Sequence, residues 1–259
     1  MILTFAMGFI WALDVLLLKR RRQAAFEPGP EAGDAPREPA IVDFSRSFFP
    51  IVLVVLLVRS FAFEPFRIPS SSMMPTLRIG DFIFVSKYSY GLRLPVLNTK
   101  VLSLGEPERG DVAVFRLPSD PATNYIKRIV GVPGDVVSLR DKRLWVNGAP
   151  VPLELHEEVL NVECGGFRFS AQRATETIGE TSHNIYLSEQ RDRSSPFLDR
   201  PVPEGRYLVM GDNRDCSRDG RVIGYIPEDH MVGRAVRIWM NWDAASKRPL
   251  WHRIGSRIE

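Results

Sequence analysis

The chain has 259 residues, and its 34 lysine and arginine residues nearly balance its 31 aspartate and glutamate residues. This length holds one large domain or two modest ones. Two cysteines and four scattered histidines, with no C-x-x-C pair and no H-E-x-x-H motif, argue against a metal site. The G-x-S-x-G, G-x-G-x-x-G and P-loop motifs are absent as well, which excludes the lipase-like, dinucleotide-binding and NTPase classes, and we expect no cofactor.

The first segment of the chain is apolar. Residues 1–18 carry only Thr4 and Asp14 as polar side chains, and as a helix they would reach about 27 Å, just enough to cross a bilayer core. The basic run Lys19–Arg22 follows the apolar residues, whereas in a secretory signal peptide the positive charges come first. We therefore expect a transmembrane segment with a basic flank over residues 1–22. An interfacial helix and a truncated start are the alternatives.

A second apolar segment follows a charged linker. Residues 23–46 are rich in Pro, Glu, Ala and Gly, which is typical of a flexible linker, and residues 47–63 are predominantly apolar. A buried core helix is the alternative for 47–63, but two apolar segments around a charged linker favour two membrane spans. Basic residues in and beside the linker place it in the cytoplasm by the positive-inside rule. The rest of the chain then lies on the extracytoplasmic side, and we expect contact with membrane lipid.

After residue 63 the pattern changes to short runs of β-forming residues bounded by Gly and Pro. Turn signals such as Gly131–Asp135 and Val146–Gly148 separate these runs, and no long amphipathic helix is evident. The pattern predicts a mostly β fold, an antiparallel β-sheet body over residues 64–259 behind two N-terminal transmembrane helices. Residues from about 154 to 200 are more polar, and we expect a less regular insert there. The β-like runs are residues 81–85, 111–117, 125–132, 136–139, 144–146, 207–210 and 235–242.

Two features of this body are candidates for catalytic chemistry. A serine triplet, Ser70–Ser72, follows the second apolar segment, and Lys127 stands in the apolar run 125–130. A serine hydroxyl becomes a good nucleophile when a nearby base takes its proton, and a lysine amine is such a base only when burial favours its neutral form. Alone, a serine triplet beside proline is usually a loop, and a lysine on a strand usually faces solvent. Together they indicate a Ser–Lys hydrolase close to a membrane.

Five motifs occur in a specific order along the chain. They are I-P-S-S-S-M-M-P-T-L at 68–77, G-D at 80–81, R-G-D-V at 109–112, Y-I-K-R-I-V-G-V-P-G-D at 125–135 and M-G-D-N-R-D-C-S-R-D-G-R at 210–221. This order resembles that of the bacterial type I signal peptidases, also called leader peptidases, which are serine peptidases with a Ser/Lys dyad. The likeness covers nearly the whole chain, most firmly residues 44–242. Each motif alone is weak, but the ordered set behind a two-span anchor is highly specific.

The resemblance implies a role for each matching residue. Ser72 matches the nucleophile and Lys127 the general base. Ser70, together with the backbone N–H of Ser72, matches the oxyanion hole, and Ser217 matches the hydroxyl that orients the lysine. The charged residues that brace the site match Asp212, Arg214, Asp219 and Arg221. The residues that line shallow apolar pockets for small substrate side chains match Phe66, Ile68, Met73, Leu77, Tyr125 and Ile126.

The chain departs from the family pattern at two positions of the last motif. It has Cys216 where the family usually has Asn, and Gly220 where Ser is common. Neither position matches a catalytic residue, so we expect activity to survive. Cys216 and Cys164 could form a disulfide in an oxidising compartment, although sequence alone does not give their separation.

These observations lead to the hypothesis of a membrane-bound serine endopeptidase that removes N-terminal signal peptides from exported preproteins after small residues, the A-x-A pattern. It would act through an acyl-enzyme, without metal or cofactor, in the bacterial inner membrane with its catalytic body on the periplasmic side. Preprotein signal peptides and lipid are its expected partners, and nucleic acid is not. One alternative is a catalytically inactive, membrane-tethered binding module. Another is a self-cleaving Ser–Lys regulator similar to SOS-type repressors, which would need a DNA-binding region in place of the apolar segments.

Overall fold

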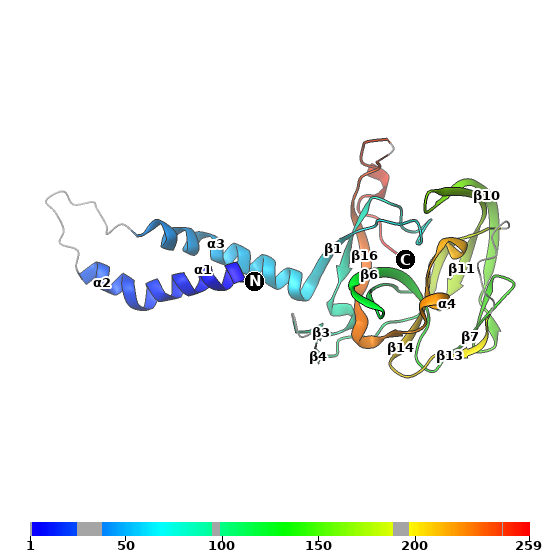
Figure 1. The fold of residues 1–259 in the computed structure, drawn as a ribbon, viewed down its shortest axis with the longest axis horizontal. Helices are drawn as coiled ribbons and strands as arrows, with labels where there is room; N and C mark the ends of the chain where they lie inside the picture. Colours follow the sequence, from blue (N-terminus) through cyan, green and yellow to red (C-terminus); the bar gives the residue numbers. More distant parts are fainter. Residues whose placement is uncertain (1, 25–37, 95–98, 189–196, 245) are drawn as a thin grey trace. The chain divides into compact units, whose positions relative to one another are not determined.

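The computed structural model describes residues 2–24, 38–94, 99–188, 197–244 and 246–259 of the chain. It divides into two compact units, Met1–Ala62 and Phe63–Glu259 (Figure 1). The first unit is helical and the second consists mainly of β-strands.

The first unit contains two helical segments. One runs through α1 (Ile2–Leu13), η1 (Asp14–Leu18) and α2 (Lys19–Ala24), and the other through α3 (Ala40–Leu57) and η2 (Val58–Ala62). Each segment has 23 residues, and a helix of that length extends about 35 Å, more than the thickness of a bilayer core. By length and composition, both segments can therefore cross a membrane.

The second helix begins earlier than the sequence predicted. The prediction placed it at 47–63, but α3 starts at Ala40, inside the predicted linker. Pro39 immediately precedes it, and the fixed φ of proline suits a helix start. Asp43 lies in the first turn, where the helix dipole favours a negative charge. The last part of the predicted linker is thus helical, whereas its residues 25–37 lie outside the described residues.

A seven-stranded sheet forms the centre of the second unit, and every neighbouring pair of its strands is antiparallel. The prediction of a mostly β, antiparallel body is therefore confirmed. Strand β6 lies in the interior of this sheet, between β5 and β14. In spatial order the strands are β1 (Phe63–Arg67), β2 (Asp81–Ser86), β16 (Met231–Asn241), β5 (Val112–Leu117), β6 (Asp120–Gly131), β14 (Arg206–Met210) and β15 (Ile226–Pro227).

Smaller sheets and short helical turns complete the described part of this unit. One sheet has the strands β10 (Leu153–Cys164), β11 (Phe167–Ile178) and β12 (Thr181–Leu187). A second has β13 (Phe197–Pro201), β7 (Val136–Arg140), β8 (Arg143–Val146) and β9 (Ala149–Pro150), and a third pairs β3 (Leu92–Arg93) with β4 (Lys100–Leu102). The helical turns are η3 (Tyr88–Tyr90), η4 (Arg214–Cys216), α4 (Gly220–Ile223), η5 (Glu228–His230) and η6 (Trp251–Arg253).

The sheet of β10, β11 and β12 corrects the prediction of a less regular insert at about 154–200. These strands are long. The pairing of β11 with β12 has no register shift, that of β10 with β11 has two, and only residues 189–196 of the region lie outside the described residues. Side chains along β11 alternate between buried and more exposed positions. An antiparallel sheet with one face toward solvent carries polar residues on that face. The polarity of this region therefore comes from an open sheet face, and it does not indicate irregular backbone.

One hydrophobic cluster connects the serine triplet to the central sheet. Ile68, Met73 and Leu77, which flank the triplet, are almost fully buried and pack in the same cluster as Ile126 of β6. The other members come from β2, β5 and β16 and from the C-terminal segment. Burial of large apolar side chains contributes about 1.5–3 kcal/mol for each residue. This shared core holds the segment around the triplet against the strand that carries Lys127.

Candidate active site

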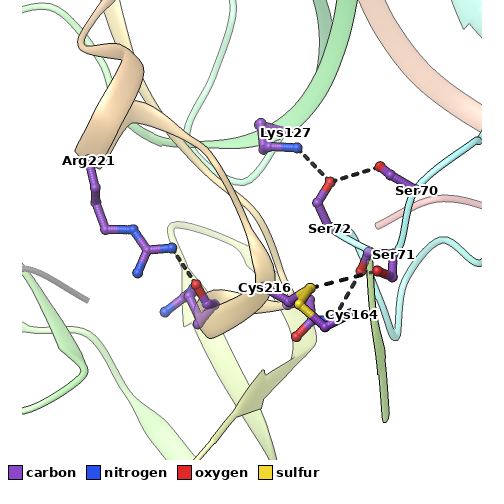
Figure 2. Close-up of a disulfide and its surroundings, with 9 residues drawn as sticks. Ser70, Ser71, Ser72, Lys127, Cys164, Cys216 and Arg221 are labelled. Carbon is purple, nitrogen blue, oxygen red and sulfur yellow. Dashed lines mark hydrogen bonds between the residues drawn. A yellow bond between two sulfur atoms is a disulfide. The ribbon is translucent and has the colours of Figure 1, made fainter. Parts of the chain in front are cut away.

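Ser72 and Lys127, 55 residues apart in the sequence, meet in the second unit (Figure 2). The lysine Nζ lies 2.6 Å from the serine Oγ, and it also donates to the carbonyl oxygen of Ile126 at 2.8 Å. Both side chains are buried, with exposed fractions of 8% for Ser72 and 3% for Lys127. The structure therefore brings the two predicted catalytic residues into direct hydrogen-bond contact.

Burial changes the proton equilibrium of Lys127. Loss of solvent lowers the pKa of its amine to about 8, although the negative charges of Asp219 and Asp212 act in the opposite direction. In the described part of the chain, no carboxylate forms an ion pair with Lys127. Because its hydrogen-bond partners are a hydroxyl and a carbonyl, the charged form is not fully compensated. A substantial fraction of the amine is therefore neutral near pH 8 and able to accept a proton.

The two other predicted serines lie at the same site. Ser70 Oγ is 3.3 Å from Ser72 Oγ, and its residue is exposed (Figure 2). Ser217 lines the same cleft as Ser72 and Lys127. Its hydroxyl is buried and makes no hydrogen bond of ordinary geometry with a described residue, although it lies close enough to Asp219 to help lower the pKa of that carboxyl. The orientation of Lys127 by Ser217 thus stays a prediction, and the carbonyl of Ile126 holds the amine in this structure.

Asn213 connects the last sequence motif to the nucleophile segment, and the sequence reasoning assigned it no role. Its backbone N–H donates to the carbonyl oxygen of Ser72, and its side-chain amide donates to that of Ser71, each at 3.1 Å. Asn213 is fully buried. These two bonds hold the backbone around Ser72 against the 210–221 motif. The position of Asn213 inside that motif was the signal that could have identified it.

A buried ion pair joins Arg128, which follows Lys127 in the sequence, to Asp212. Asp212 accepts two hydrogen bonds from Arg128, at 2.9 and 2.7 Å, and a third from the hydroxyl of Thr76 at 2.5 Å. Both ionic side chains are essentially inaccessible to solvent. Burial alone would raise the pKa of Asp212, but the Arg128 guanidinium brings the pKa below its usual value. Asp212 was predicted as a bracing residue, whereas its partner Arg128 was missed.

The remaining predicted bracing residues form two further ion pairs. Asp219 accepts from Arg221 at 2.8 and 2.9 Å and from the backbone N–H of Gly211 at 2.9 Å, and it caps the N-terminus of α4. Arg214 pairs with Glu176 on β11, so it links the catalytic motif to the three-stranded sheet. Arg221 also donates to the backbone carbonyl of Arg214. These contacts fix the conformation of the motif around Ser217.

His183 lies close to two of the carboxylates in these ion pairs, Glu176 and Asp212. It is buried, and its Nε2 lies 3.4 Å from Glu176 and 3.9 Å from Asp212. Burial lowers the pKa of His183, while Glu176 and Asp212 partly offset this effect. Among the described residues, no group of three or more His, Cys, Asp and Glu side chains is arranged to hold a metal ion.

The six predicted pocket residues divide into two groups. Tyr125 and Ile126 line an open cleft of about 1000 Å³ that also contains Ser70, Ser72 and Lys127. The other four belong to the hydrophobic cluster that joins the triplet to the sheet, with Ile68, Met73 and Leu77 buried and Phe66 packed against them. The sequence could not separate the two groups because apolar side chains suit a pocket wall and a core equally well.

A disulfide lies close to Ser72, the predicted nucleophile. Cys164 at the end of β10 is bonded to Cys216, with a Cα–Cα distance of 5.6 Å (Figure 2). The Sγ of Cys216 is 3.7 Å from the hydroxyl of Ser71, the residue before the nucleophile. The question that the sequence left open is thus answered: the two cysteines are joined.

The chain is similar in sequence to known signal peptidases over most of its length. The family described as "Signal peptidase, peptidase S26" matches residues 41–240. Signal peptidase I of Pseudomonas fluorescens is 42% identical over 270 residues, which cover 96% of this chain and 93% of that protein. Signal peptidase I of Pseudomonas aeruginosa is 43% identical with the same coverage. Signal peptidase I of Haemophilus influenzae is 35% identical over 294 residues, covering 93% of this chain and 84% of that protein.

Proposed function

The chain belongs to the signal peptidase family, peptidase S26, and from this premise we propose that it cleaves signal peptides from preproteins with Ser72 as nucleophile and Lys127 as general base. It is a serine endopeptidase, as are the members of this family. The observation that carries the proposed mechanism is the 2.6 Å contact between Lys127 Nζ and Ser72 Oγ in a buried environment. A general base must lie within such a distance of the proton that it abstracts.

The proposed reaction uses the lysine amine twice. Neutral Lys127 takes the proton of Ser72 Oγ while this oxygen bonds to the carbonyl carbon of the scissile peptide. The ammonium then gives the proton to the leaving nitrogen, the C–N bond breaks, and an acyl-enzyme forms. In the second half, neutral Lys127 takes a proton from water while the water oxygen bonds to the ester carbon. The bond from this carbon to Ser72 Oγ then breaks, the lysine ammonium returns the proton to Ser72 Oγ, and the signal peptide leaves with a new carboxyl group. The lowered pKa of Lys127, about 8, suits both directions of proton transfer.

The negative charge on the carbonyl oxygen of the tetrahedral intermediate needs hydrogen-bond donors. The Ser70 hydroxyl, 3.3 Å from the nucleophilic oxygen, and the backbone N–H of Ser72 are the proposed donors. Removal of one such donor typically lowers the rate about 10²–10³-fold. Ser217 is proposed to orient the lysine amine once substrate has displaced water from the cleft.

The proposed substrate presents small side chains before the cleavage site, in the A-x-A pattern. Tyr125 and Ile126 would contact these side chains from the wall of the cleft. Phe66, Ile68, Met73 and Leu77 would shape the same pockets from the core beneath.

We further propose that the two apolar helices anchor the enzyme in the bacterial inner membrane, in contact with lipid, with the β unit on the periplasmic side. The length and composition of both helices support the anchoring. The disulfide between Cys164 and Cys216 supports the periplasmic side, because disulfides persist in oxidising compartments and are rare in the cytosol.

The test uses the purified full chain in detergent with a preprotein that carries an A-x-A site, and intact mass spectrometry reads the products. Ser72→Ala and Lys127→Ala are the active-site variants, and Lys87→Ala, which removes a lysine paired with Glu64 on the edge of the sheet, is the matched control. Cleavage after the second small residue by wild type and Lys87→Ala alone would support the proposal.

Two other results would contradict it at different levels. Cleavage that survives Lys127→Ala would keep the peptidase and overturn the lysine mechanism. Failure of the wild type on several preproteins would favour an inactive, membrane-tethered binding module.

A further inference from the structure

The cleft that contains the catalytic pair has a second wall, which comes from a different sheet. The tip of the β10–β11 hairpin contributes Glu163, Cys164, Gly165 and Phe167 to the lining of the same cleft as Ser72. This hairpin belongs to the three-stranded sheet, whereas Lys127, which lines the same cleft, belongs to the central sheet. A peptide in the cleft would therefore lie between two sheets.

The hairpin tip is attached to the catalytic segment by a covalent bond and by apolar packing. The disulfide joins Cys164 to Cys216, 52 residues further along the chain and directly before Ser217. Near the tip, Val162 packs in one hydrophobic cluster with Met74, which lies two residues beyond the nucleophile, and with Cys216. Because both attachments end within two residues of a predicted catalytic residue, the wall is held in a defined position relative to Ser72.

Phe167 presents a large apolar surface at this wall. It lines the cleft, and its exposed fraction is 67%. Phe169, two residues further along the same strand, is buried. Binding sites for organic ligands are lined mainly by apolar and aromatic side chains, and an aromatic ring buries a large area when a ligand covers it. An exposed phenylalanine in a cleft that holds a nucleophile and a base is therefore placed to contact the molecule on which they act.

We propose that the tip of the β10–β11 hairpin is a substrate-binding wall, on which Phe167 contacts an apolar side chain of the bound preprotein near its cleavage site. The disulfide acts as a positioning link that keeps this wall at a fixed distance from Ser72. The inference rests on the proposed function, because the occupant of the cleft is the extended peptide that the catalytic pair cleaves. It adds a specificity-determining residue from a different sheet than the one that carries Tyr125 and Ile126.

The chain offers a matched control for Phe167. Leu160 lies on β10 of the same hairpin and has a similar exposed fraction, 66%, but it does not line the cleft. Steady-state cleavage of one preprotein would be compared for wild type, Phe167→Ala, Phe167→Leu and Leu160→Ala. We expect Phe167→Ala to raise KM about tenfold with kcat changed less than about twofold, since burial of part of an aromatic ring against a ligand is lost. Phe167→Leu should recover most of the affinity, and Leu160→Ala should match the wild type.

The positioning role of the disulfide is tested by Cys164→Ser combined with Cys216→Ser, after thermal unfolding has shown that this variant is folded at the assay temperature. We expect KM to rise as in Phe167→Ala. Adding Phe167→Ala to the double serine variant should then change KM by less than about twofold, because coupled residues are not additive. If the two changes raise KM by fully additive free energies, the link between the disulfide and Phe167 is overturned.

The outcomes separate this inference from the proposed function. If wild type and Leu160→Ala cleave the preprotein and Phe167→Ala has an unchanged KM, the substrate-binding wall is refuted and the peptidase stands. If Leu160→Ala raises KM as much as Phe167→Ala, the effect belongs to the hairpin in general and the specific role of Phe167 is refuted. If the wild type cleaves no preprotein, the proposed function falls and this inference falls with it.

Discussion

Lys127 and Arg128 are adjacent cations on β6 that lie in two different environments. Lys127 is hydrogen-bonded to a hydroxyl and a carbonyl, and burial lowers its pKa to about 8. Arg128 donates two hydrogen bonds to the carboxylate of Asp212 and a third to the carbonyl of Gly110 at 2.6 Å. Successive residues of a strand point to opposite faces, so one residue step separates a reactive amine from a fully paired guanidinium.

The difference shows two ways in which a protein can accommodate a buried cation. Desolvation disfavours the charged form, and this free energy either shifts the proton equilibrium or is offset by an ion pair. Lysine suits the first solution because its pKa is within reach of neutral pH, and arginine suits the second because it stays charged and binds a carboxylate with two bonds. The Lys127 face of β6 should therefore control reactivity, and the Arg128 face should control stability.

The largest expected effect is the loss of activity on the Lys127 face. Lys127→Met keeps the length of the apolar stem and removes the base, so kcat/KM for preprotein cleavage should fall at least about 10³-fold. The melting temperature should be unchanged or higher, because an incompletely compensated buried amine is removed. Preprotein cleavage assays and differential scanning fluorimetry measure the two quantities. A stable Lys127→Met variant with more than a tenth of wild-type activity would contradict the assignment of reactivity to the Lys127 face.

On the Arg128 face, the expected effect is on the free energy of unfolding. Arg128→Met leaves the carboxylate of Asp212 buried without its ion-pair partner, which should lower stability by about 3–5 kcal/mol. Arg140→Met, at an exposed ion pair with Asp199, should lower it by less than about 1 kcal/mol. Urea unfolding followed by tryptophan fluorescence compares the two variants. Equal losses of unfolding free energy in the two variants would show that burial of the Arg128–Asp212 pair does not determine its contribution to stability.

The same contrast explains how much of the site could be predicted from the sequence. Ser72 and Lys127 lie in short motifs that are weak signals alone, but the order of the motifs along the chain resembles that of a known family, and the structure brings the two residues within 2.6 Å. The pairing of Arg128 with Asp212 joins residues 84 apart, and local sequence carries no signal for such a distance. Cys164 and Cys216 are separated by 52 residues, so the sequence offered their bond as a possibility, and the structure shows that the two cysteines are close enough to form it.

The fold was predictable where a periodic pattern is strong. Runs such as 81–85 and 111–117 became strands of the central antiparallel sheet. The prediction failed at the three-stranded sheet, because polar side chains on its open face conceal the alternation of buried residues. It also missed the first seven residues of α3, from Ala40 to Arg46, where Pro39 precedes the helix and Asp43 lies in its first turn.

The pH dependence of activity gives a smaller effect on the Lys127 face. The amine must be neutral to act as base, and its lowered pKa is about 8. Below that pH the neutral fraction falls tenfold with each pH unit, so kcat/KM should decrease about a hundredfold from pH 9 to pH 6 and level off above pH 9. Because the charge of Asp219 raises the pKa of Lys127, Asp219→Asn should move the inflection to lower pH. A flat profile down to pH 5 would exclude a lysine base.

The smallest expected effect concerns Thr76, whose hydroxyl donates a hydrogen bond to Asp212, the ion-pair partner of Arg128. Thr76 donates to Asp212 at 2.5 Å, and Thr76→Val removes this bond while it keeps the shape of the side chain. The loss should be about 1–2 kcal/mol of stability, less than for Arg128→Met, because the charge of Asp212 stays paired. Thr177→Val, which removes an exposed bond to Ser182, should stay within about 0.5 kcal/mol.

Cleavage by Thr76→Val should remain within about twofold of wild type, since no partner of Lys127 changes and the lost bond affects folding rather than proton transfer. Urea unfolding and kcat/KM on the same preparations give the two numbers. Stability and activity should therefore separate along β6: variants around Asp212 change unfolding, and variants around Ser72 change turnover. A Thr76→Val enzyme with normal stability and a large loss of turnover would show that the two faces are coupled, because the electrostatic influence of Asp212 on Lys127 would then outweigh its role in folding.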